Sequence, residues 1–165
     1  MKLADLVLPE FDQEMATTRK LLERVPTDKG TFKPHPKSFS LGHLSQLISN
    51  MPGWITKVIK DTELNVAGGP GYSYEATEVL LANFDRNVRE ARDAIRSAQE
   101  SDFDVPWSLK AGETVLFTDS RRTVLWQTIN HLVHHRGQLS VYLRMNDIPL
   151  PSIYGPTADE PWGRA

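Results

Sequence analysis

Four long segments of the chain carry apolar residues at every third or fourth position, which is the period of an amphipathic helix. These segments cover approximately residues 9–26, 41–58, 73–100 and 121–145. Pro9 suits the first turn of the first helix, and Pro26 marks its end. We therefore predict four helices, and the candidate caps of the last three are Ser38 or Ser40, Ser73, and Asp119 or Ser120.

The segment between the third and fourth helices has a different pattern. Residues 105–109 and 114–117 are short runs of β-prone side chains, separated by Lys110-Ala111-Gly112-Glu113. These runs predict a small β-hairpin or extended excursion. The whole pattern indicates an all-α fold, a four-helix bundle that forms a single domain of residues 1–165. After Met145 several prolines prevent a continuous helix, so we expect this tail to wrap over the surface.

The fourth helix carries the residues with the clearest chemistry. His131 and His135 are four positions apart, which places them one turn apart on the same face of the helix. Two imidazoles in this arrangement can bind one metal ion. His134 falls on the far side of the helix. The alternative interpretation is that His131 and His135 are hydrogen-bonded side chains at the polar edge of a core helix.

Composition narrows the classes of function. Nineteen basic and 21 acidic residues give a net charge of -2 without a basic stripe, which argues against electrostatic binding of nucleic acid. The chain has no cysteine, and this excludes disulfides, thiolate metal ligands and a cysteine nucleophile. The first residues lack the pattern of a signal peptide, and no apolar run is long enough to span a membrane. We expect a cytoplasmic protein that does not bind membranes.

Several motifs match a known family. The fourth helix holds the stretch His131-Leu132-Val133-His134-His135-Arg136-Gly137-Gln138, and Ile148-Pro149-Leu150-Pro151 follows it. Earlier in the chain stand Lys33-Pro34-His35-Pro36 and Met51-Pro52-Gly53-Trp54. Together these motifs resemble the DinB-like (DinB/YfiT-like) superfamily over nearly the whole chain.

The resemblance implies a four-helix bundle, often dimeric, that carries a divalent metal ion on three histidines. Two of these come from the last helix, where this chain has His131 and His135, and imidazole ligands suit Zn²⁺ or Ni²⁺. Members of known activity are thiol-dependent S-transferases, and hydrolases or isomerases, that act on conjugates of small thiols. The implied partners of this chain are a small-molecule substrate, a low-molecular-weight thiol and a second copy of the chain in a homodimer.

The third ligand departs from the family pattern. The resemblance places it in the second helix, at the position where this chain has Leu47. His43 stands one turn earlier, and we predict it as the third metal ligand beside His131 and His135. His35 in the linker is a weaker substitute, and a carboxylate such as Glu14 is another alternative.

Four residues near the predicted metal site have two interpretations each. Gln138 is expected to orient one of the imidazoles. Trp54 and Tyr142 either line a pocket or serve only in packing. Arg136 lies near the apolar stripe and is expected to form a structural ion pair rather than to bind a substrate carboxylate.

Two functions are consistent with these observations. The first is a metal-dependent enzyme, a thiol-dependent S-transferase or hydrolase acting on a small molecule, in which the ion makes a bound water or thiol nucleophilic at neutral pH. The second is a non-catalytic, metal-free bundle that serves as a ligand-binding or dimerisation module, because Leu47 replaces a ligand. The direction of His43 distinguishes them, since a metal ligand must point into the bundle.

Overall fold

The structure, a computed structural model, describes residues 2–68, 71–72 and 75–161. These residues form four α-helices: α1 (Leu3–Leu22), α2 (Leu41–Lys60), α3 (Thr77–Ser97) and α4 (Arg121–Arg144). The strands are β1 (Glu63–Asn65), β2 (Pro106–Ala111) and β3 (Thr114–Ser120), and short 3-10 helices cover Thr27–Lys29 and Glu100–Asp104. The predicted mostly helical fold with four long helices is confirmed.

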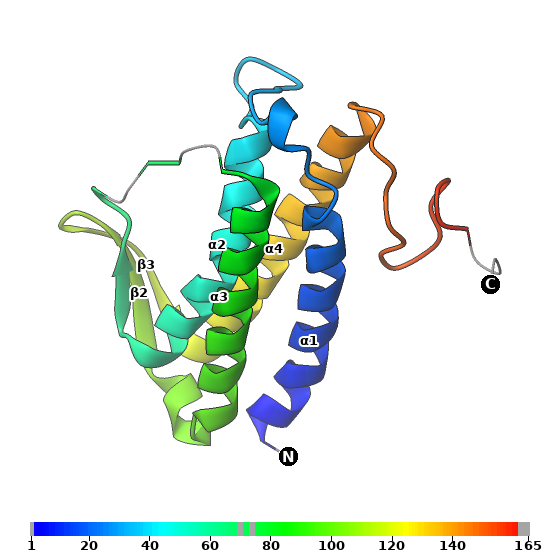
Figure 1. Cartoon of the computed structure of the whole chain (residues 1–165). Coiled ribbons are helices and arrows are strands. Elements are labelled where there is room, and N and C mark those ends of the chain that lie inside the picture. The colour runs from blue at the N-terminus through cyan, green and yellow to red at the C-terminus, as the bar shows by residue number, and fades with distance from the viewer. Residues whose placement is uncertain (1, 69–70, 73–74, 162–165) are drawn as a thin grey trace.

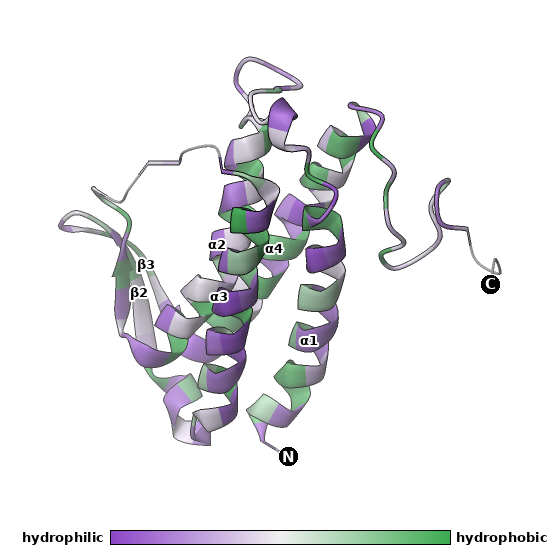
Figure 2. Ribbon diagram, viewed as in Figure 1, coloured by the Kyte–Doolittle hydropathy of each residue, from purple (hydrophilic) through white to green (hydrophobic). Residues whose placement is uncertain are grey.

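The four helices pack side by side around one apolar core (Figure 1). Both α1 and α2 contact α3 and α4, so α1 and α2 lie diagonally across the bundle. Hydrophilic and hydrophobic residues alternate along the helices, as the amphipathic pattern requires (Figure 2). The apolar stripe of α4 is buried as predicted, and it comprises Leu125, Ile129, Leu132, Leu139 and Leu143.

The helix boundaries differ from the prediction at two places. Helix α1 begins at Leu3 and continues through Pro9, instead of beginning near Pro9. The reason is that Leu3 and Val7 are buried and extend the apolar stripe by another two turns, which outweighs the loss of one backbone hydrogen bond at the proline. Helix α3 begins at Thr77, after Ala76, and the predicted cap Ser73 lies outside the described residues.

Two predicted caps are present. The Ser40 hydroxyl accepts a hydrogen bond from the His43 backbone N–H at 3.2 Å, at the start of α2. The Ser120 hydroxyl accepts one from the Thr123 backbone N–H at 3.3 Å, at the start of α4. Each serine satisfies a backbone donor that the helix leaves unpaired, so the first turns of α2 and α4 are fixed in place.

The strands form one small sheet in the order β1-β2-β3. Strands β2 and β3 pair antiparallel between α3 and α4, with Trp107 opposite Asp119. Strand β1 pairs parallel to β2, with Leu64 opposite Leu109, and the sequence pattern did not predict it. The sheet lies on one side of the helices and the C-terminal tail on the other (Figure 1). None of the helices in the described residues is long and apolar enough to cross a membrane.

Candidate functional site

Helix α4 brings His131 and His135 together. Their Nε2 atoms are 2.9 Å apart, and their ring centroids are 4.6 Å apart. The predicted stacking of the two imidazoles on one helix face is therefore present, and both rings direct the same nitrogen toward one point. The His131 ring also lies 6.0 Å from the Trp54 ring on α2, so the pair sits between α4 and α2.

Gln138 orients the buried member of the pair. Its Oε1 lies 2.8 Å from His135 Nδ1, and its Nε2 lies 3.0 Å from His134 Nε2. An amide oxygen can only accept, so the proton of a neutral His135 is on Nδ1 and its Nε2 carries a lone pair. That lone pair accepts a hydrogen bond from His131 Nε2–H. The expectation that Gln138 supports an imidazole is consistent with this contact.

The surroundings favour a neutral His131 ring. Loss of hydration lowers the pKa of His131, and the neighbouring His135 and His134 lower it further. A neutral imidazole is the form that binds a metal ion or accepts a proton. His131 is therefore available for either role at neutral pH.

His43 lies apart from this pair. Its ring is stacked between Phe39, at a centroid distance of 4.2 Å, and Tyr72, at 4.0 Å. Loss of hydration lowers the pKa of His43, and the positive charge of Lys33 adds to this effect. Phe39 also contacts His135, with ring centroids 6.4 Å apart. The aromatic stack therefore holds the His43 ring on the Phe39 side of the histidine pair.

The donor set fits a metal ion only in part. Among the described residues, no group of three or more His, Asp or Glu side chains is placed to hold an ion. Leu47, at the position where the resemblance places a histidine, is a buried core residue. His35 accepts a hydrogen bond from the Lys37 backbone N–H within the exposed linker. The structure thus brings two imidazole nitrogens together, and no third His, Asp or Glu side chain among the described residues joins them.

Glu14 and Arg136 form a buried ion pair with each other. Arg136 Nη1 lies 2.6 Å from Glu14 Oε2, and the two side chains are only 2% and 1% exposed. The Tyr154 hydroxyl accepts from Arg136 Nη2 at 2.7 Å and donates to Glu14 at 2.8 Å. Burial and the hydrogen bond to Glu14 raise the pKa of Tyr154. Arg136 is thus in a structural ion pair, and the Glu14 carboxylate is engaged in that pair.

Tyr142 and Trp54 have different surroundings. Tyr142 packs edge-on against Phe32 and donates a hydrogen bond to the Phe39 backbone carbonyl at 3.3 Å. It therefore fixes the segment that carries Phe39. Trp54 lines two separate cavities.

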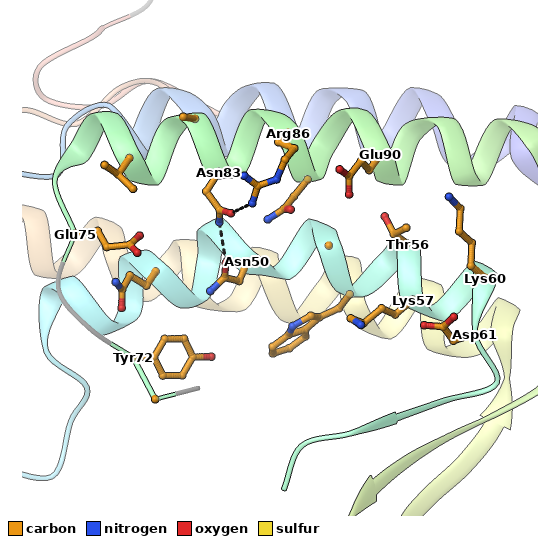
Figure 3. A pocket seen from close by; sticks show the side chains of 17 residues that line it. Asn50, Thr56, Lys57, Lys60, Asp61, Tyr72, Glu75, Asn83, Arg86 and Glu90 are labelled. Carbon is orange, nitrogen blue, oxygen red and sulfur yellow. Dashed lines mark hydrogen bonds between the residues drawn. The ribbon is translucent and has the colours of Figure 1, made fainter. Parts of the chain in front are cut away.

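The larger cavity is a polar groove of about 1030 Å³ between α2 and α3 (Figure 3). Asn83 on α3 faces Asn50 on α2, and its Nδ2 donates to Asn50 Oδ1 at 2.7 Å. Arg86 and Glu90 line the same wall. Gln46 Oε1 is buried beside this groove without a hydrogen-bond partner in the described part of the chain. The groove therefore offers both donors and acceptors to a polar ligand.

Sequence reasoning missed two features of this region. The aromatic stack on His43 joins Phe39 from a linker to Tyr72 from a loop, and neither residue belongs to a periodic pattern. The groove is lined by polar residues on helix faces that the sequence presents as ordinary solvated surface. The amides Gln46, Asn50, Asn83 and Asn87 recur on the facing sides of α2 and α3, and this recurrence is the only sequence signal for the groove.

Comparisons with known proteins agree with this fold. The sequence model of the DinB family matches residues 2–162. A DinB-like protein of Bacillus subtilis has a similar structure, with a TM-score of 0.68 and 21% identity, over 90% of this chain and 96% of that one. A DinB-like protein of Bacillus cereus has the same TM-score with 18% identity, over 89% of this chain and 95% of that one. These likenesses show the fold. A comparison with curated proteins finds no match.

Proposed function

The chain belongs to the DinB family, and from this premise we propose that it binds a divalent metal ion through His131 and His135 and acts on a small molecule. The observation that carries the proposal is the 2.9 Å approach of the two Nε2 atoms. Two nitrogen ligands at Zn–N distances of 2.0–2.1 Å in tetrahedral geometry lie about 3.3 Å apart. The rings therefore need only a small rotation to exchange their hydrogen bond for an ion such as Zn²⁺ or Ni²⁺.

The chain's own residues prepare this pair. The Nδ1–H···Oε1 bond from His135 to Gln138 keeps the lone pair on Nε2, and it fixes the orientation of the ring. His131 must move its proton from Nε2 to Nδ1, which its neutral state allows. We propose His43 as the third ligand, reached when its ring leaves the stack between Phe39 and Tyr72. A bound ion of this kind lowers the pKa of a water or thiol at its open position.

The proposed reaction is thiol-dependent S-transfer or hydrolysis. The chain has no cysteine, so the thiol would be a low-molecular-weight molecule supplied from outside. The polar groove beside Trp54 supports a small-molecule partner of this type, because amide side chains and charged groups of both signs line it. In this proposal residues 1–165 form one four-helix-bundle domain that acts in the cytoplasm as a homodimer.

A second candidate function is a metal-free bundle that binds a ligand or forms dimers. Two observations favour it: Leu47 is buried where a ligand is expected, and His43 is held by its aromatic neighbours. Under this candidate the hydrogen bond between His131 and His135 is the permanent state of the pair.

Metal content per chain distinguishes the two candidates. Elemental analysis of protein purified without a histidine tag or chelator should give about one ion per chain. His131→Ala and His135→Ala should each lose the ion and keep the helical circular dichroism, and His43→Ala should bind it more weakly. His35→Ala is the matched control, since His35 lies in the exposed linker, and it should keep the ion. Retention of the ion by either α4 variant would show that the histidine pair does not hold it, and no uptake of added Zn²⁺ or Ni²⁺ by the unchanged chain would favour the metal-free candidate instead.

A further inference from the structure

A second cavity lies between the sheet and the helices. It has a volume of about 400 Å³, at the small end of the range of about 300–1,000 Å³ that is usual for ligand pockets. All three strands contribute to one wall, through Leu64, Leu109 and Phe117 among others. Helices α2 and α4 form the other wall, so the cavity is enclosed by five elements of the fold.

The lining of this cavity carries no lysine, arginine or carboxylate, and His131 is its one titratable side chain. Aromatic and aliphatic side chains dominate, with Trp54, Trp107 and Phe117 as the rings. Thr128 also lines it, but its hydroxyl already donates to the Val124 carbonyl at 2.7 Å. A charged ligand would lose its hydration here without meeting a lysine, arginine or carboxylate, so the cavity favours uncharged molecules.

One polar atom of a residue that lines the cavity lacks a partner. Trp107 is only 3% exposed, and its Nε1 has no hydrogen-bond acceptor within the described residues. A buried indole N–H normally finds an acceptor, because leaving it unpaired costs free energy. A ligand that carries an acceptor oxygen would satisfy it, and a pure hydrocarbon would not.

The cavity ends at the histidine pair. Val124, Thr128 and His131 lie on successive turns of one face of α4, and all three line the cavity. His131 Nε2 in turn meets His135 Nε2. A molecule in the cavity therefore contacts the sheet on one side and can reach His131 on α4.

We propose that this cavity binds an uncharged aromatic molecule bearing one acceptor oxygen, which hydrogen-bonds to Trp107 Nε1. The proposal rests on the proposed function in one respect, because it treats the histidine pair as the place where such a substrate reacts. The proposal gives the class of the substrate. Its apolar group packs against the sheet, and the polar groove that Trp54 also lines binds a polar partner.

Binding of acetophenone tests this proposal, with benzoate as a charged ligand of nearly the same shape. Acetophenone should bind saturably, shift the ring resonances of His131 and move the indole N–H resonance of Trp107, while His35 in the linker stays unchanged. Benzoate should bind about tenfold or more weakly, since the negative charge of its carboxylate meets no lysine or arginine in the cavity. Equal binding of the two, or no movement of the Trp107 and His131 resonances, would overturn the proposal.

Variants that fill the cavity provide the second measurement. Leu64→Trp should weaken acetophenone binding about tenfold or more, because the added rings occupy the ligand's space. Val66→Trp, at an exposed lining residue outside the strands, repeats the test if the first variant folds poorly. Leu116→Trp is the control, at an exposed position of β3 that does not line the cavity, and it should bind as the unchanged chain does. Full affinity in both filled variants would refute the assignment.

The same titrations, run before and after removal of metal with a chelator, separate this proposal from the proposed function. Acetophenone binding by a chain that never takes up metal would leave the cavity assigned and the metal-dependent function wrong. Metal uptake without acetophenone binding would support the metal-dependent function and show that the assignment of the cavity is wrong.

Discussion

At the scale of single residues, the position of one proton decides what the histidine pair can do. Gln138 holds the His135 proton on Nδ1, so His135 Nε2 always presents a lone pair. His131 is the adaptable member, because either of its nitrogens can carry the proton. The pair is thus divided into a fixed ligand and an adjustable one.

Gln138→Leu should weaken Zn²⁺ binding about 10–100-fold, which is the usual effect of losing the group behind a histidine ligand. The fold should stay intact, because Gln138 is exposed and lies outside the apolar stripe of α4. Affinity can be measured by competition with a chromophoric chelator. Asn130→Leu is the matched control, since Asn130 is exposed on the same helix, and its affinity should equal that of the unchanged chain. Equal affinities in both variants would mean that Gln138 does not support the ligand.

Sequence reasoning succeeded for His131 and His135 because helix geometry alone brings residues four apart together. It could not place His43 in the same way. The position of that ring depends on Phe39 and Tyr72, which come from irregular segments on either side of α2. The sequence likewise indicated that Arg136 is in a structural ion pair, but the partner Glu14 is 122 residues away and no local pattern connects them.

At the scale of elements, two glycines inside helices have opposite surroundings. Gly53 in α2 faces α3 closely, since an added Cβ would lie 3.3 Å from Cγ and Oδ1 of Asn87. Asn87 in turn donates to the Ser49 carbonyl at 3.0 Å, which restrains it. Gly137 in α4 has no described atom within 4 Å of an added Cβ. Close packing of α2 on α3 therefore depends on one glycine and not on the other.

Gly137→Ala should raise the free energy of unfolding by about 0.5–1 kcal/mol, because alanine is the better helix former and meets no neighbour. Gly53→Ala should bring no such gain, since its methyl group displaces Asn87 and strains the α2–α3 contact. Urea denaturation of the two variants gives the comparison directly. An equal gain in both variants would show that the α2–α3 interface accommodates the added methyl group at Gly53 without strain.

The elements themselves were predictable to different degrees. Strands β2 and β3 follow from β-prone runs flanking a turn, since both lie within one short segment. Strand β1 is only three residues long and pairs across the whole of α3, so its sequence offers too few positions for a pattern. The early start of α1 was missed because the proline rule outweighed the spacing of Leu3, Val7 and Phe11 in the prediction.

At the scale of the whole molecule, one buried network joins three distant parts of the chain. Glu14 belongs to α1, Arg136 to α4 and Tyr154 to the tail. The Arg136 guanidinium also lies 5.1 Å from the centre of the Tyr154 ring. A further ion pair, from Arg144 to Asp159 at 2.5 Å, holds the tail to the end of α4. The tail is therefore attached to the bundle by the polar contacts of Tyr154 and Asp159.

Glu14→Gln should lower the free energy of unfolding by about 3–5 kcal/mol, because it leaves the buried Arg136 charge without its counter-ion. Glu10→Gln, at an exposed position one turn earlier on α1, should change it by no more than about 0.5 kcal/mol. Chemical denaturation measures both. A loss of similar size in the two variants would contradict the assignment of Glu14 as the counter-ion of a buried charge.

The parallel pairing of β1 with β2 makes one wall of the apolar cavity depend on a contact between segments that are distant in sequence. Glu63–Asn65 pairs with Ser108–Lys110 across the whole of α3, and contacts so distant in sequence are slow to form. Strand β1 is held by only these three residue pairs, fewer than the pairs that join β2 to β3. Local opening at such an edge costs less than global unfolding. A ligand can therefore enter the cavity when β1 opens locally, while the four helices stay folded.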